Sequence, residues 1–82
     1  MLKILYFGKL GELTQLREER VDVPNDINTI EALKSWLNTR HDLDCALSHP
    51  SIKTMIDQKL VHTNESIEGA QEIGFLPPVG GG

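Results

Sequence analysis

The stretch MLKILYF, residues 1–7, decides how the rest of the sequence is interpreted. It is apolar except for Lys3, and its aromatic side chains and β-branched Ile4 favour a strand over a helix. Because apolar and polar residues hardly alternate in this stretch, it is predicted to be a central strand that is buried on both faces of a sheet. Since successive side chains point to opposite faces, the two faces carry Leu2, Ile4 and Tyr6 on one side and Leu5 and Phe7 on the other.

The apolar periodicity of the remaining chain predicts a series of short elements. In order, they are one or two helical turns within 9–17, a strand at 18–23, a helix from 30 to about 39–41, and strands at 52–56, 60–61 and 72–76. Thr29 suits the N-cap of the helix, whose apolar stripe is Ile30, Leu33 and Leu37. Residues 1–76 are thus predicted to be one α+β domain, with one main helix packed on one face of a mixed sheet. If the first and last strands are parallel neighbours, this is the ubiquitin-like β-grasp arrangement.

Size and charge exclude several classes of function. A chain of 82 residues needs most of its apolar side chains for folding, which leaves little room for an enclosed catalytic pocket. The net charge is −4 and the 8 Lys and Arg residues are scattered along the chain, so a nucleic-acid partner is not expected. A partner protein with a basic surface is expected instead. No apolar run approaches the roughly 20 residues of a membrane span. Cys45, the only cysteine, permits no internal disulfide and fits a reducing cytoplasm.

Catalytic side chains are hard to find in this sequence. His41, His49 and His62 lack the spacing of metal ligands and are expected to be exposed to solvent. Cys45 lies among small apolar residues, a setting more typical of a buried hydrophobe than of a nucleophile. The sequence therefore predicts no active site of its own within the domain and no bound cofactor or metal.

The C-terminal stretch, FLPPVGGG at residues 75–82, is different. In order, it contains the end of a strand (Phe75, Leu76), two prolines that keep the chain stiff and extended (Pro77, Pro78), one apolar side chain that a partner can bind (Val79) and three residues without side chains (Gly80, Gly81, Gly82). Glycine-rich ends are commonly frayed termini. However, ordering glycine loses more entropy than ordering any other residue, so a purely structural role does not explain this ending. Residues 77–82 are predicted to be an extended, flexible tail that enters a narrow active site of another protein.

The reactive group of such a tail is the carboxylate of Gly82. A carboxylate is a poor electrophile at neutral pH, so it must first be activated, most plausibly as an acyl-adenylate made by a separate ATP-dependent enzyme. A sulfur donor can then displace the nucleotide and leave a thiocarboxylate, whose sulfur is a soft nucleophile. A chain that carries sulfur in this way needs no catalytic residues of its own; it has only to fold, bind its partner and extend its tail.

The ending Phe75-Leu76-Pro77-Pro78-Val79 followed by Gly81-Gly82 resembles the F-F/L-P-P-V-x-G-G ending of the small, sulfur-carrying subunits of molybdopterin synthase. Three other segments are similar to that family: the first strand at 3–7, the helix start at 29–33 and the turn at 56–61. The family often has Asn in place of Asp57, and its usual Gly-Asp-Glu before the last strand appears here as Ala70-Gln71-Glu72. These departures concern loop contacts, whereas the ending is the discriminating part.

The resemblance implies a non-catalytic sulfur-carrier subunit in molybdenum cofactor biosynthesis. Gly82 would be adenylated by an enzyme related to ubiquitin activators, converted to a thiocarboxylate, and would give its sulfur to cyclic pyranopterin monophosphate within the large subunit. Two small and two large subunits would form the assembly. The expected partner-binding residues are the exposed apolar side chains Leu5, Phe7, Leu60, Phe75 and Leu76, together with the tail residues Pro77, Pro78, Val79, Gly80 and Gly81.

Three alternatives remain open from the sequence. The chain could carry sulfur in thiamine or tRNA thiolation, although carriers of those pathways usually lack Phe-Leu-Pro-Pro before their Gly-Gly ends. It could be a ubiquitin-like modifier that is joined through Gly82 to target lysines. It could also be a binding module whose tail is inert.

Overall fold

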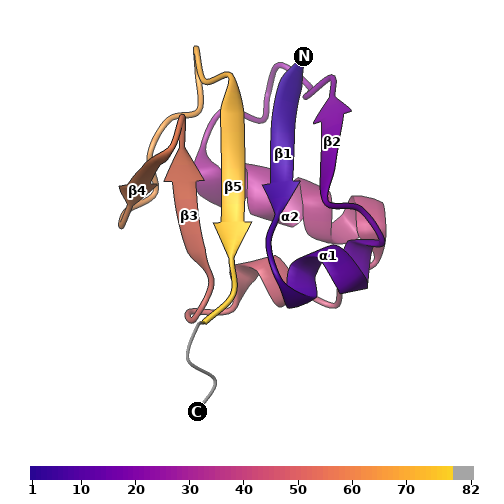
Figure 1. Ribbon diagram of the computed structural model, residues 1–82. Helices are drawn as coiled ribbons and strands as arrows, with labels where there is room; N and C mark the ends of the chain where they lie inside the picture. Colours follow the sequence, from indigo (N-terminus) through magenta and orange to yellow (C-terminus); the bar gives the residue numbers. More distant parts are fainter. Residues whose placement is uncertain (79–82) are drawn as a thin grey trace.

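Five strands form one mixed sheet in the computed structural model, which describes residues 1–78 (Figure 1). The elements are β1 (Leu2–Tyr6), α1 (Lys9–Thr14), β2 (Glu18–Val21), α2 (Ile30–His41), a 3-10 turn η1 (Ala46–Ser48), β3 (Lys53–Ile56), β4 (Lys59–Val61) and β5 (Glu72–Leu76). The predicted roles of Val79, Gly80, Gly81 and Gly82 lie outside the described residues.

The first and last strands are parallel neighbours at the centre of the sheet. The strand order is β2-β1-β5-β3-β4, and Ile4 pairs with Ile73 while Tyr6 pairs with Phe75. All the other pairings, β1 with β2, β3 with β5 and β3 with β4, are antiparallel. This is the β-grasp arrangement, so the predicted fold class is confirmed.

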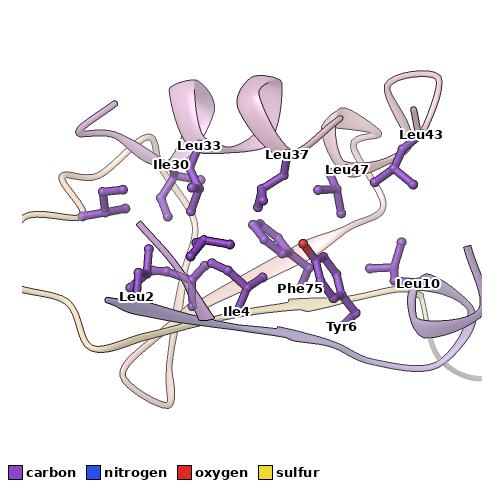
Figure 2. Packing of buried hydrophobic residues seen from close by; sticks show 13 residues of the cluster. Leu2, Ile4, Tyr6, Leu10, Ile30, Leu33, Leu37, Leu43, Leu47 and Phe75 are labelled. Atoms are coloured by element: carbon purple, nitrogen blue, oxygen red, sulfur yellow. The ribbon is translucent and has the colours of Figure 1, made fainter. Parts of the chain in front are cut away.

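Helix α2 covers one face of the sheet and closes the core (Figure 1). The fully buried side chains that meet between the two layers include Leu33 and Leu37 from the helix and Ile4 and Phe75 from the sheet (Figure 2). Ile73 belongs to the same buried cluster. Tyr6 stacks against Phe75 with ring centroids 6.3 Å apart. The prediction that Leu2, Ile4 and Tyr6 share a face is confirmed, and that face is the inner one.

The expectation that Phe75 belongs to an exposed docking surface is wrong. Its side chain is fully buried, because it follows Ile73 by two residues and therefore points to the same inner face. Neighbouring residues of one strand cannot both face outward, so of the pair Phe75 and Leu76 only Leu76 lies on the outer face.

The main helix begins and ends where its sequence predicts. The Thr29 side chain accepts a hydrogen bond from the Ala32 backbone N–H at 3.3 Å, and Asn64 Oδ1 accepts another from Glu31 N–H at 2.9 Å. The helix ends at His41, and Asp42 adopts a left-handed conformation. The short helix α1, Lys9–Thr14, has the predicted one to two turns, and of its leucines only Leu10 is buried.

A polar cluster under the edge strand was not predicted. Glu19, on the inner face of β2, accepts a hydrogen bond from Tyr6 Oη at 2.6 Å, lies 2.5 Å from His41 Nε2 and pairs with Arg40 at 3.4 Å. Burial by itself would raise the pKa of Glu19, but the hydrogen bonds from Tyr6 and His41 and the charges of His41 and Arg40 together lower it. His41 is therefore half-buried rather than exposed as expected. Cys45, expected to be buried, is exposed.

The turn between β3 and β4 fixes the start of β5. Asp57 Oδ1 accepts hydrogen bonds from the backbone N–H groups of Gln71 at 2.9 Å and Glu72 at 3.0 Å. The Asp57 N–H in turn donates to the Glu72 carbonyl at 2.9 Å. This carboxylate therefore has a structural role that an Asn side chain, whose carbonyl oxygen is also an acceptor, could fill.

Leu33→Ala should lower the free energy of unfolding by about 2–5 kcal/mol, because it removes fully buried methyl groups and leaves a cavity beneath α2. Urea denaturation measures the change. Ser35→Ala, on the exposed side of the same helix, is the matched control and should shift the value by less than about 0.5 kcal/mol. Equal stability of the Leu33 variant and the unchanged chain would contradict the observed packing.

Glu19→Gln should make the protein less stable at neutral pH and flatten its loss of stability in acid. Folding lowers the pKa of Glu19, so ionised Glu19 stabilises the native state above the usual glutamate range, and this contribution is lost as the pH falls through the lowered value. Denaturation at a series of acidic pH values tests this. Glu68→Gln, at an exposed position, serves as the control; an acid profile of the Glu19 variant that matches the unchanged chain would argue against the cluster.

Candidate functional site

The predicted tail leaves from the middle of the sheet rather than from its edge. Strand β5 has β1 on one side and β3 on the other, and it ends at Leu76. Because β1 and β5 are parallel, both end on the same side of the molecule (Figure 1). Pro77 is partly buried, whereas Pro78 is exposed. The prolines that were predicted to aim the tail thus follow directly from a central strand.

Gly8 lies against Pro77, the residue at the base of this tail. It has φ 54° and ψ −131°, a backbone conformation that side chains disfavour strongly. A Cβ at this position would lie 3.0 Å from Pro77 Cγ, so the glycine lets the proline ring pack closely on the turn after β1. The Phe7 N–H also donates to the Phe75 carbonyl at 3.1 Å, which ties the two chain segments together just before the exit.

The outer face of the sheet is apolar near this exit. Leu5, Gly74, Met55 and Leu60 are register partners in one row across β1, β5, β3 and β4, and therefore share that face. Leu60 is 51% exposed and Phe7 is 42% exposed, while Leu5, Met55 and Leu76 are half-buried. Four of the predicted docking residues, Leu5, Phe7, Leu60 and Leu76, therefore lie on the outer face, with Leu60 on the edge strand β4 and separated from Leu5 by β5 and β3.

A shallow hollow lies within this outer face. Gly74 is one of its lining residues, and it lets the Phe7 ring approach the strand, since an added Cβ would lie 3.1 Å from Phe7 Cε2. The residues that line the hollow are Leu5, Phe7, Met55, Gln58, Glu72 and Gly74. Sequence reasoning missed Met55, Gln58, Glu72 and Gly74. A glycine inside a strand pattern was the available signal, since it often marks the close approach of another group.

Metal-binding clusters and membrane-spanning helices are both absent from the described part of the chain. Within residues 1–78, no group of three or more His, Cys, Asp and Glu side chains could hold a metal ion. None of the helices in this part of the chain is long and apolar enough to cross a membrane. The outer apolar face and the base of the tail are features that suit recognition by another protein.

Comparison with known proteins identifies close relatives. The ThiS family model matches residues 4–82. The chain is 30% identical over 83 residues to the molybdopterin synthase sulfur carrier subunit of Escherichia coli, with both chains fully covered. It is also 30% identical over 84 residues to the subunit of that name from Homo sapiens, with 99% of this chain and 93% of the human protein covered.

Solved structures show the same fold at lower identity. The crystal structure of SAMP1 from Haloferax volcanii has a TM-score of 0.75 at 22% identity, and covers 99% of this chain and 98% of that one. A putative molybdopterin converting factor, subunit 1, from Pyrococcus furiosus has a TM-score of 0.74 at 18% identity, with 95% and 97% covered.

Gly8→Ala should lower the free energy of unfolding by about 1–3 kcal/mol, because it forces a side chain into a disfavoured conformation. The added methyl group would also crowd Pro77. Thermal and urea denaturation measure the loss. In a Pro77→Ala background the same change should cost less, since the crowding is relieved while the backbone strain remains. Strictly additive losses would show that the two residues do not pack together.

Proposed function

The chain belongs to the ThiS family, and we propose that it is the sulfur carrier subunit of a molybdopterin synthase. The observation that carries this proposal is similarity along the whole chain to sulfur carrier subunits of that name, at 30% identity. The ending Pro77-Pro78-Val79 with Gly81-Gly82 supports the same assignment. The alternatives in thiamine or tRNA thiolation are less favoured, because all three matching curated relatives carry the molybdopterin synthase name.

The chemistry takes place at the carboxylate of Gly82. An adenylating enzyme related to ubiquitin activators uses ATP to form the acyl-adenylate and releases pyrophosphate. Sulfur at the oxidation level of sulfide then attacks the carbonyl carbon, the bond to the AMP oxygen breaks, AMP leaves, and a thiocarboxylate remains. Within the large subunit, this sulfur passes to cyclic pyranopterin monophosphate, and hydrolysis restores the carboxylate. The ATP site belongs to the partner enzyme, so the carrier needs no cofactor of its own.

The large subunit docks on the outer apolar face and receives the tail. Leu5, Phe7, Leu60 and Leu76 supply the exposed apolar surface, and Phe7 is followed directly by Gly8, on which Pro77 packs. A partner that takes the tail at Pro77 therefore meets Phe7 next. Side chains that are apolar and clustered around such an exit are typical of the centre of a protein interface. The assembly of two small and two large subunits, acting in the cytoplasm, completes the proposal.

A thiocarboxylate on the chain isolated from its own cells is the expected result. Intact-mass measurement should show an exchange of oxygen for sulfur, and fragmentation should place it at Gly82. A chain found joined to lysines of other proteins would instead indicate a ubiquitin-like modifier. A chain that carries neither change would indicate an inert tail and contradict the proposal.

Removing Gly82, or adding one residue after it, should abolish sulfur transfer in an assay with the adenylating enzyme and the large subunit. The reason is that the reactive carbonyl would be displaced from both active sites. Thermal stability should remain that of the unchanged chain, since the core and sheet lie within residues 1–76. Full activity in either variant is incompatible with a carrier role for the terminal carboxylate.

A further inference from the structure

Basic side chains gather at one hollow of a chain that is acidic as a whole. The chain has 12 Asp and Glu residues against 8 Lys and Arg residues. At this hollow the balance is reversed, because its lining contains two lysines and two histidines but a single acid. The charged and titratable lining residues are Lys34, Lys53, His49, His62 and Glu31.

The hollow lies on the helix side of the sheet and is called the helix-side hollow below. Ile30 and Lys34 line it from α2, and Thr54, which is buried, lines it from β3. Val61, on the edge strand β4, is the register partner of Thr54 and therefore shares its face. The helix-side hollow is thus separate from the outer apolar face, which the proposed function assigns to the large subunit.

The cations of the helix-side hollow are only partly neutralised by the chain itself. The Lys34 side chain is 12% exposed and pairs with Glu31 at 3.6 Å, but Glu31 is 59% exposed, so water weakens this pair. Lys53 makes no ion pair within residues 1–78. In His49, Nδ1 accepts the Ser51 N–H at 3.1 Å, so Nε2 is the ring nitrogen that donates. A concave surface lined by one sign of charge attracts the opposite sign.

Backbone donors at the start of α2 are already used within the chain. The Ile30 N–H donates to the Glu65 carbonyl and the Glu31 N–H donates to Asn64 Oδ1, both at 2.9 Å. A free phosphate at a helix start is held by such N–H groups when they lack partners. Recognition at the helix-side hollow therefore rests on side-chain cations instead.

The size of the helix-side hollow also favours a chain segment over a small ion. Its volume is about 290 Å³, whereas one water molecule takes up about 30 Å³ of the liquid, so an ion of a few water volumes would leave most of it empty. Lys34 lines it from the helix and Lys53 from the sheet. A segment with several carboxylates contacts both of these walls at once.

We propose that the helix-side hollow binds an acidic segment of a partner protein. Carboxylates of this segment pair with Lys34 and Lys53, and one of them accepts a hydrogen bond from His49 Nε2. The net charge of the chain predicts a basic partner for its surface as a whole, and this hollow is a local exception. The inference does not depend on the sulfur chemistry of the tail, since no lining residue belongs to the outer apolar face or to the tail.

A hexaglutamate peptide with blocked ends is the probe for the acidic segment. Titrated at low salt into the isotope-labelled full chain, it should shift the backbone NMR signals of residues that line the helix-side hollow. Lys34→Gln and Lys53→Gln should each weaken this binding about twofold to fivefold, because each removes one charge from the lining. Lys34 is half-buried whereas Lys53 is exposed, so Lys53→Gln decides the test if Lys34→Gln proves unfolded in a thermal scan.

Lys9→Gln is the matched control. Lys9 is exposed on α1 and does not line the helix-side hollow, so this change removes the same charge at another place. The affinity for hexaglutamate should then be that of the unchanged chain. Equal weakening by Lys9→Gln and Lys53→Gln would show attraction to the overall charge and would overturn the site.

Inorganic phosphate separates a chain segment from a small ion. If phosphate shifts the same signals as tightly as hexaglutamate does, with the same losses in the two lysine variants, the hollow binds small anions and the acidic segment is overturned. If hexaglutamate shifts no signals, or only signals elsewhere, the site itself is overturned. Neither result bears on the sulfur-carrier assignment, which the transfer assay on the Gly82 variants tests by itself.

Discussion

The parallel pairing of β1 with β5 is the constraint on which the rest of the molecule depends. It places the apolar N-terminal run and the last strand side by side at the centre of the sheet, where both gain neighbours on each side. Because the strands are parallel, they end together, and the turn at Gly8 meets the chain at Pro77. The tail therefore leaves from a central strand that is paired on both sides.

Successive side chains of β5 point to opposite faces of the sheet, so the two faces differ in composition. Ile73 and Phe75 point inward and stabilise the domain against α2, while Gly74 and Leu76 face outward. The inner face follows ordinary rules of packing, with fully buried aliphatic and aromatic side chains. On the outer face, Gly74 leaves room for the Phe7 ring, since an added Cβ would lie 3.1 Å from Phe7 Cε2, and Gln58 holds a left-handed conformation in the turn between β3 and β4.

Much of the site could be predicted from the sequence, and the misses have physical causes. Leu5 and Phe7 were assigned correctly to the face opposite Ile4 and Tyr6, because strand alternation is a local property. Phe75 was misplaced because two adjacent residues were assigned to one face, which a strand does not allow. The hollow around Gly74 was missed because it depends on which residues of four strands become register partners, and no single stretch encodes that.

By itself, the sequence determined the elements and the family. The last strand at 72–76, the helix cap at Thr29 and the ending from Pro77 to Gly82 are local signals of periodicity, capping and motif. Only the tertiary structure decided which contacts form between distant residues, such as Glu19 with His41. It also decided the left-handed conformation of Gln58, because the pairing of β3 with β4 imposes that turn on a residue whose own preference is against it.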